Sequence, residues 1–136
     1  MKILFICAGN SIRSQIAEGW ARHLGGDKIE VASAGISAGG VHPQAIAIMK
    51  DAGLDISGHK TRPVSDYLLD WADLIITVCD EVRPYCIIFP KDKKHLHWSI
   101  PDPFAMTQIS EDKAFGKVRD MLQSKVRNLL DDLDLD

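Results

Sequence analysis

The feature that most constrains this chain is an apolar segment that leads without a break into a cysteine-containing loop and then a helix. Residues 3–6 are Ile-Leu-Phe-Ile, and Cys7 begins the sequence C-x5-R-S, which ends at Arg13 and Ser14. A continuous apolar run is typical of a parallel strand that is covered on both faces. A helical pattern starts at Ile12. The chain is therefore expected to build a strand–loop–helix unit with a thiol where the strand ends.

Five residues between Cys7 and Arg13 suffice for a loop whose backbone N–H groups all turn inward and bind an oxyanion. We call residues 7–13 the oxyanion loop. Its predicted anion-binding residues are Ala8, Gly9, Asn10, Ser11, Ile12 and Arg13. Gly9 and Asn10 are residue types that tolerate the positive φ that such a loop requires. The following helix adds the positive end of its dipole, and Arg13 adds a planar fork suited to a tetrahedral anion.

The same surroundings favour the thiolate form of Cys7, which makes this residue a candidate nucleophile. The alternative is a buried cysteine at the end of a strand, followed by an ordinary turn and helix. The residue types at Gly9, Asn10 and Arg13 favour the oxyanion site, because each lies where the loop needs it.

Length and charge limit the class of protein. With 136 residues, 46% of them hydrophobic and 26% charged, the chain is expected to form one globular domain over residues 1–136. A net charge of −3 argues against nucleic-acid binding, since there is no basic stripe for phosphates. The apolar runs are too short for a membrane span or a signal peptide, which predicts a cytoplasmic protein. Three cysteines do not form a disulfide framework.

Apolar runs and helical patterns alternate along the whole chain. The expected strands are residues 2–7, 29–34, 74–78 and 94–98. The expected helices are residues 14–24, a helix from Pro43 that stops at Gly53, and residues 64–71 and 112–133, with a loop over 57–63. Alternation of this kind predicts an α/β domain with a parallel sheet and right-handed crossovers. Ligands of such sheets bind at the carboxyl ends of the strands.

Two further cysteines lie at and shortly after the end of the third expected strand. Cys79 follows that strand, so it lies at the same edge of the sheet as Cys7. Cys86 follows after six intervening residues, and a disulfide between the two needs that segment to bend or rearrange. One interpretation is a redox relay in which Cys7 is the first member. The alternatives are two independent cysteines, one buried and one in a loop, and a zinc site that adds His95 and His97.

Asp102 lies between two prolines in a loop that follows the fourth expected strand. The flanking prolines fix the backbone, which suits a carboxyl group that reaches across a site as a general acid. An aspartate between prolines is also a common turn residue, so this alternative stays open. Four histidines are expected to be structural or on the surface: His42, His59, His95 and His97.

Taken together, these motifs resemble those of the low-molecular-weight protein tyrosine phosphatase superfamily and, within it, the thioredoxin-coupled arsenate reductases. The oxyanion loop resembles the superfamily's nucleophile loop, and the following Gln-Ile-Ala-Glu-Gly at residues 15–19 resembles the reductase branch. Further similar stretches are residues 33–35, 55–59, 97–98 and 102–103. Cys79-x6-Cys86 matches the reductase pattern, which ordinary phosphatases of the family do not have.

The resemblance implies a three-layer α/β/α fold with a four-stranded parallel sheet, and it implies an oxyanion site for arsenate and phosphate. Cys7 would attack arsenic while Arg13 and the loop amides hold the oxygens. Asp102 would protonate the leaving oxygen, and Ser14 would donate its hydroxyl to the Cys7 sulfur.

The relay is also implied by the resemblance. Cys79 would attack Cys7 and release arsenite, and Cys86 would then attack Cys79. The resulting Cys79–Cys86 disulfide would become exposed and be reduced by thioredoxin. No metal ion or organic cofactor is expected, nor any membrane partner, and the enzyme is expected to act as a monomer.

Three positions depart from the reductase pattern. Ile12 stands where many reductases have a second cysteine, and Ile87 stands where they have a proline after the second redox cysteine. A potassium site of some reductases resembles Asn10, Glu18 and Ser33, but Arg62 replaces its aspartate. We expect the Arg62 guanidinium to occupy the place of the cation and to make the enzyme indifferent to potassium.

Two other functions stay open. The first is a phosphatase that uses Cys7, Arg13 and Asp102 through a phosphocysteine, with the other two cysteines protecting Cys7 from oxidation. Tyrosine phosphatases of the family usually have a tyrosine after Asp-Pro, where this chain has Phe104. The second is a non-enzymatic oxyanion-binding or redox-sensing module.

Overall fold

The computed structural model describes residues 1–134; residues 135–136 of the expected domain lie outside the described residues. Four strands make up the sheet: β1 (Lys2–Cys7), β2 (Glu30–Gly35), β3 (Leu74–Thr77) and β4 (Lys94–His97). The α-helices are α1 (Arg13–Gly25), α2 (Pro43–Asp51), α3 (Asp66–Trp71) and α4 (Glu111–Leu133). Three short 3₁₀ helices are η1 (Gly26–Lys28), η2 (Asp80–Ile88) and η3 (Pro103–Ala105).

All four strands are parallel and lie in the order β2-β1-β3-β4. The register aligns the strand ends: Cys7 is opposite Gly35, Ile6 is opposite Thr77, and Thr77 is opposite His97. The carboxyl ends of the two central strands therefore meet where β1 runs into the oxyanion loop and β3 runs into Cys79. This is the edge at which the sequence predicts the site.

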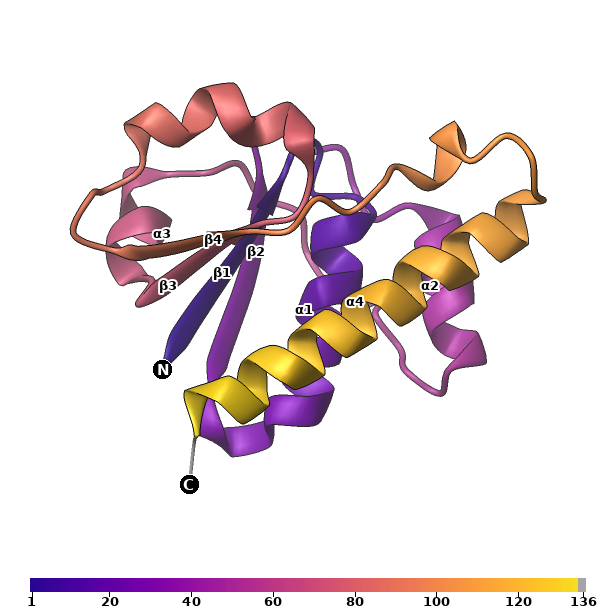
Figure 1. The fold of residues 1–136 in the computed structure, drawn as a ribbon, viewed down its shortest axis with the longest axis horizontal. Helices are drawn as coiled ribbons and strands as arrows, with labels where there is room; N and C mark the ends of the chain where they lie inside the picture. Colours follow the sequence, from indigo (N-terminus) through magenta and orange to yellow (C-terminus); the bar gives the residue numbers. More distant parts are fainter. Residues whose placement is uncertain (135–136) are drawn as a thin grey trace.

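Helices cover both faces of the sheet (Figure 1). Helices α1, α2 and α4 gather on one side, and α3 and η2 lie on the other. The strand residues Ile3, Leu4, Phe5 and Ile6 are completely buried between these layers. The three-layer α/β/α fold with a four-stranded parallel sheet is therefore confirmed. No helix within residues 1–134 is long and apolar enough to cross a membrane.

Side chains that precede the helices fix where several of them begin. Ser65 Oγ accepts a hydrogen bond from the Leu68 N–H at the start of α3, and Ser110 Oγ accepts one from Lys113 at the start of α4. His42 Nδ1 does the same for Gln44 in α2, whose first residue is Pro43. These are the backbone donors that a helix cannot satisfy internally.

The segment between the two later cysteines differs from the expectation. Cys86 was expected in a loop under the independent-cysteine alternative, but it lies in η2, a nine-residue 3₁₀ helix that includes Pro84. Proline removes one backbone donor, and nine residues are long for a 3₁₀ helix, since such runs rarely exceed about four residues. Val82 is completely buried and anchors η2 against the sheet.

Candidate active site

The backbone carbonyl groups of the oxyanion loop point away from the centre of the loop. The six carbonyls of residues 7–12 accept hydrogen bonds of 2.9–3.2 Å from the N–H groups of Ile36, Ser37, Gly39, His42 and Ile16, and from the Gln15 side chain. None of the backbone N–H groups of residues 8–12 donates to an oxygen atom within residues 1–134. The Ala8 N–H is hydrogen-bonded to the Cys79 sulfur. Because every carbonyl is held outside, the N–H groups of residues 9–12 are left for an anion, and anion binding by this loop stays a prediction.

The turn of this loop depends on Asn10 and on the strand beneath it. Asn10 has a φ of 51° and is completely buried. Of the two residues expected to tolerate a positive φ, Asn10 adopts it and Gly9 does not. Asn10 Oδ1 accepts from the Arg62 N–H at 3.0 Å, and this bond ties the left-handed residue to the neighbouring loop. Asparagine tolerates this conformation better than most residues do.

A chain of hydrogen bonds leads to the sulfur of Cys7. Asn10 Nδ2 donates to Ser14 Oγ at 2.8 Å, and Ser14 Oγ lies 2.9 Å from Cys7 Sγ. Because Ser14 accepts from Asn10, its own hydroxyl hydrogen is free to point at the sulfur. Cys7 is nearly inaccessible, with 3% of its surface exposed. The geometry therefore fits a hydroxyl group that donates to the Cys7 sulfur.

Arg13 begins α1 and is held by groups from two distant segments. Its Nη1 donates to the Ile100 carbonyl at 2.9 Å, and its Nη2 lies 3.2 Å from Glu81 Oε1. Ile100 belongs to the loop that carries Asp102, so Arg13 connects that loop to the oxyanion loop. Glu81 belongs to η2. The sequence analysis did not identify Glu81, although its position two residues after Cys79 was a signal.

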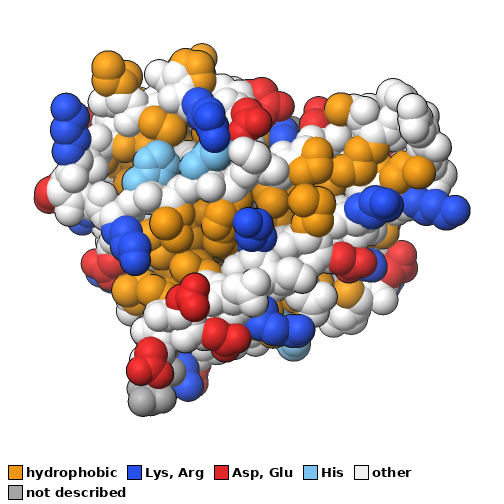
Figure 2. Space-filling view, viewed as in Figure 1, with side chains coloured by type: hydrophobic (Ala, Val, Ile, Leu, Met, Phe, Trp, Pro, Cys, Tyr) orange, Lys and Arg blue, Asp and Glu red, His pale blue; other side chains and the backbone are white. Residues whose placement is uncertain are grey.

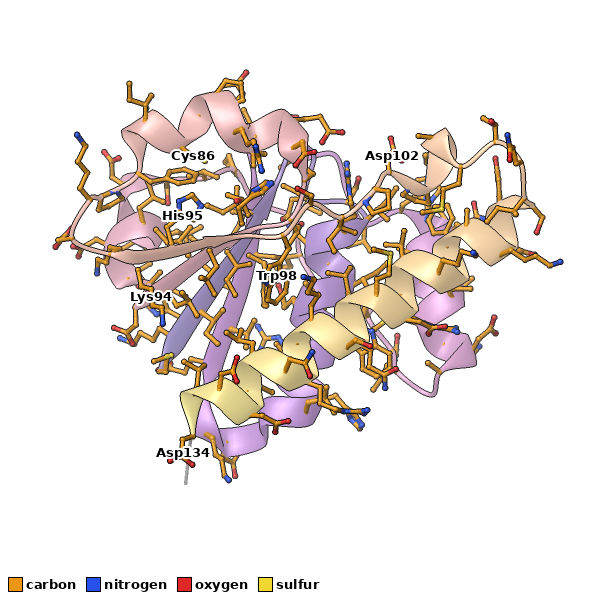
Figure 3. All side chains as sticks on the ribbon, viewed as in Figure 1. Cys86, Lys94, His95, Trp98, Asp102 and Asp134 are labelled. Atoms are coloured by element: carbon orange, nitrogen blue, oxygen red, sulfur yellow. The ribbon has the colours of Figure 1, made fainter. Side chains whose placement is uncertain are left out.

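Asp102 caps the short helix η3. Its Oδ1 accepts a hydrogen bond of 2.9 Å from the Phe104 N–H. The helix cap therefore uses Oδ1 and does not use Oδ2. Phe104 packs against Phe115 and His42, with ring centroids 5.4 and 5.5 Å apart. In Figure 3, Asp102 lies on one side of the carboxyl ends of the strands and Cys86 on the other.

Cys79 is completely buried, follows β3, and lies close enough to Cys7 and Arg13 for both charges to affect it. Burial raises the pKa of the Cys79 thiol to about 11, against smaller opposing effects of the Arg13 charge and the Ala8 backbone. Cys79 is therefore a neutral thiol at pH 7. Burial also raises the pKa of Cys86, which is partly exposed and whose Sγ lies 3.7 Å from the Val82 carbonyl.

A polar cluster fastens the start of η2 to β4. His97 Nε2 lies 2.7 Å from Asp80 Oδ1, and Ser99 Oγ donates to the same oxygen at 2.8 Å. These hydrogen bonds lower the pKa of Asp80, which is a carboxylate at neutral pH. His97 Nδ1 also bonds Thr77 Oγ1 at 2.6 Å. His97 is thus structural, as expected, and Figure 2 shows histidine surface beneath η2.

The alternative zinc set does not come together. Thr77 Oγ1 contacts a ring nitrogen of His95 at 3.2 Å and one of His97, while the Cys86 sulfur contacts Val82. Within residues 1–134, no group of three or more His, Cys, Asp or Glu side chains is arranged to hold a metal ion. The redox relay and the independent cysteines remain as interpretations of Cys79 and Cys86.

The residues compared with a potassium site surround a buried carboxylate. Glu18 accepts from Ser33 Oγ at 2.6 Å and from Arg22 Nε at 2.9 Å. Arg22 lies one turn after Glu18 on α1, so the cation beside this carboxylate is Arg22. Arg62 contributes its backbone N–H to Asn10, and the place of its guanidinium beside this carboxylate stays a prediction. The sequence signal for Arg22 was its i, i+4 spacing from Glu18.

Sequence comparison relates this chain to the low molecular weight phosphatase family and to arsenate reductases. The profile of the family described as low molecular weight phosphotyrosine protein phosphatase matches residues 2–136. The chain is 40% identical to an arsenate reductase of Halalkalibacterium halodurans over 127 residues, which cover 92% of this chain and 91% of that protein. It is 39% identical to an arsenate reductase of Bacillus subtilis over 92% of this chain and 91% of that protein.

Solved structures of two kinds share this fold. An arsenate reductase in its phosphate-binding state has a TM-score of 0.79 and 34% identity, covering 96% of this chain and 97% of that chain. The YwlE arginine phosphatase of Geobacillus stearothermophilus has a TM-score of 0.84 and 25% identity, covering 97% of this chain and 92% of that chain. The backbone thus fits both a reductase and a phosphatase.

Proposed function

The chain belongs to the low molecular weight phosphotyrosine protein phosphatase family, and we propose that it reduces arsenate to arsenite through Cys7, Cys79 and Cys86. Its similarity to arsenate reductases over most of its length supports arsenate reduction. The observation that carries the relay is the burial of Cys79 beside the oxyanion loop, at the carboxyl end of the strand next to β1. A second thiol so close to a nucleophilic cysteine suits disulfide formation.

Binding uses the inward N–H groups of residues 8–12, the amino end of α1 and the Arg13 guanidinium. Arsenate and phosphate are near-isosteric tetrahedral anions, so the site is expected to take both. The structure of a related arsenate reductase in its phosphate-binding state supports this expectation. The net charge of −3 means that attraction comes from the local donors rather than from the protein surface as a whole.

The first chemical step is attack of the Cys7 thiolate on arsenic. An oxygen leaves arsenic as water after Asp102 supplies a proton, and an S–As bond forms with arsenic still pentavalent. Ser14 holds the thiolate before attack through its hydrogen bond to the sulfur. Arg13 and the loop amides hold the remaining oxygens during the displacement.

The second step transfers two electrons. Cys79 loses its proton and attacks the Cys7 sulfur, an S–S bond forms, and the pair of electrons of the S–As bond stays on arsenic. Arsenic becomes trivalent and leaves as arsenite, while the two sulfurs are oxidised to the Cys7–Cys79 disulfide. Cys86 then attacks Cys79 and restores the Cys7 thiolate.

The relay requires η2 to rearrange, because Cys79 is buried and Cys86 lies seven residues away on this helix. The outer surface of η2 carries exposed apolar side chains, with Ile87 82% and Ile88 61% exposed. Hydrophobic surface lies over η2 at the top of Figure 2. We assign the reduction of the Cys79–Cys86 disulfide to thioredoxin, an external dithiol protein that this apolar surface can accommodate.

The enzyme works in the cytoplasm as a monomer, on a small oxyanion, without nucleic acid. It needs no metal ion or organic cofactor, because the three thiols and thioredoxin supply the electrons.

A phosphatase is the second candidate, and the likeness to the YwlE arginine phosphatase favours it. Cys7, Arg13 and Asp102 would then form and hydrolyse a phosphocysteine. The feature that weighs against it is the Cys79–Cys86 pair, which phosphate hydrolysis does not use. A non-enzymatic oxyanion-binding or redox-sensing module would not need a general acid, so the presence of the candidate acid Asp102 weighs against that function.

The test is arsenate-dependent oxidation of NADPH in the presence of thioredoxin and thioredoxin reductase. Wild-type protein is expected to turn over, and Cys79→Ser is expected to show no turnover above background. The contrary result is absence of arsenate turnover together with hydrolysis of an aryl phosphate that Cys7→Ser abolishes. That outcome would make the protein a phosphatase.

A further inference from the structure

The guanidinium that should bind the oxyanion is already paired with a carboxylate. Arg13 Nη2 lies 3.2 Å from Glu81 Oε1, in an ion pair between α1 and η2. The Arg13 side chain is 11% exposed and the Glu81 side chain is 52% exposed. A planar guanidinium binds carboxylates and tetrahedral oxyanions through the same N–H groups. Glu81 therefore uses a donor that an incoming oxyanion also needs.

Glu81 is an anion under ordinary conditions. A hydrogen bond from its own backbone N–H and the positive charge of Arg13 lower the pKa of its carboxyl group. An arsenate or phosphate on the oxyanion loop would bring a second negative charge to the same guanidinium. Like charges that share one cation repel each other, which weakens the hold of Arg13 on Glu81.

The position of Glu81 links this competition to the redox cysteines. Glu81 lies in the first turn of η2, two residues after Cys79. That turn is fixed at two points: Glu81 to Arg13, and Asp80 to His97 and Ser99. Loss of the first attachment leaves the polar contacts with β4 and the packing of the buried Val82, so the segment that must move in the relay becomes easier to open.

We propose that Glu81 is an internal competitor for the oxyanion, and that its pairing with Arg13 couples filling of the oxyanion loop to release of η2. The competition is independent of the reaction; its use in the relay rests on the proposed function. Coupling of this kind is reciprocal. An oxyanion loosens η2, and an opened η2 strengthens oxyanion binding. Cys79 is thus held in its buried position until substrate is bound.

The first test compares the affinity of the reduced protein for inorganic phosphate, measured by calorimetry, in wild type and Glu81→Gln. Removing the competing charge is expected to tighten phosphate binding about three- to fivefold. Asp80→Asn is the matched control, since it removes one negative charge from the adjacent residue but loses partners on the β4 side. Its phosphate affinity is expected to stay within about twofold of wild type.

Two results of this test would overturn the proposal. Phosphate affinity of Glu81→Gln equal to that of Asp80→Asn would show that only total charge matters. Weaker binding would show that Glu81 orients Arg13 for the anion instead of competing with it. Because Glu81 is half-exposed and glutamine has its shape, the fold is expected to persist, and thermal unfolding checks this.

The second test measures hydrogen exchange of the amides of residues 80–88 with and without saturating phosphate. Wild-type exchange is expected to accelerate several-fold with phosphate. In Glu81→Gln the exchange is expected to be fast already and to change little. Unchanged exchange in wild type would refute the coupling. Neither readout requires arsenate turnover, so a failure here is distinct from a failure of the reductase assay.

Discussion

Replacing Gly35 by alanine should damage the oxyanion loop from beneath. Gly35 ends β2, opposite Cys7, and a Cβ atom there would lie 2.3 Å from the Ser37 carbonyl oxygen and 2.7 Å from the Asn10 nitrogen. Ordinary contacts between such atoms are about 3.5 Å, so the backbone must move by about 1 Å. Both neighbours are backbone atoms, and no change of rotamer can relieve the clash.

The expected cost has two parts. Overpacking of this kind typically destabilises a protein by about 1–3 kcal/mol. A displacement of about 1 Å in a positioned site can reduce activity about 100-fold. Urea unfolding measures the loss of stability, and phosphate affinity together with arsenate turnover measures the loss of activity.

Gly58→Ala is the matched control for Gly35→Ala. A Cβ atom at Gly58 meets no heavy atom within 4 Å, and Gly58 does not have a positive φ. We expect its free energy of unfolding to stay within about 0.5 kcal/mol of wild type. If Gly35→Ala bound phosphate as wild type does, the assignment of the loop amides as the oxyanion site would be refuted.

Three further perturbations test other parts of the site. Ser14→Ala removes a hydrogen bond to the Cys7 sulfur. Because charge-assisted hydrogen bonds contribute roughly 1.5–3 kcal/mol, alkylation of Cys7 at pH 7 should slow about 10- to 100-fold. An unchanged alkylation rate would exclude Ser14 as a donor to the sulfur. Burial raises the pKa of Cys79 to about 11, so the unfolded chain loses this proton at a lower pH than the folded protein does. The free energy of unfolding of the wild type should therefore fall between pH 9 and 11, by up to about 1.4 kcal/mol per pH unit more than that of Cys79→Ala. Below pH 8 the two proteins should show the same pH dependence. Arg22 pairs with Glu18, so potassium and sodium chloride at equal ionic strength should give turnover within about twofold, and strong activation by potassium would contradict this.

The alternation of strands and helices predicted the sheet because each buried strand is a short apolar run with clear ends. The rule that parallel strands end at one edge then placed Cys7 and Cys79 together. The turn of the loop was predictable for a similar reason, since Asn10 and Arg13 lie only a few residues from Cys7. Local spacing fixes these relations before any tertiary contact forms.

Relations between distant residues could not be predicted in the same way. Glu81 and Arg13 are 68 residues apart, and their ion pair depends on the path of η2 over the sheet. Gly9 and Asn10 both tolerate a positive φ, and only the structure shows that the left-handed turn of the loop lies at Asn10. Arg22, four residues after Glu18 on the same helix, donates to its carboxylate, and the sequence analysis did not consider this contact.

The most direct measurement of the relay is mass spectrometry of Cys86→Ser after incubation with arsenate and no external reductant. The account predicts one equivalent of arsenite per protein and a trapped disulfide between Cys7 and Cys79. Cys79→Ser treated in the same way should form neither. Multiple turnovers by Cys86→Ser with thioredoxin, equal to wild type, or absence of the Cys7–Cys79 disulfide when arsenite is released, would contradict the three-cysteine mechanism.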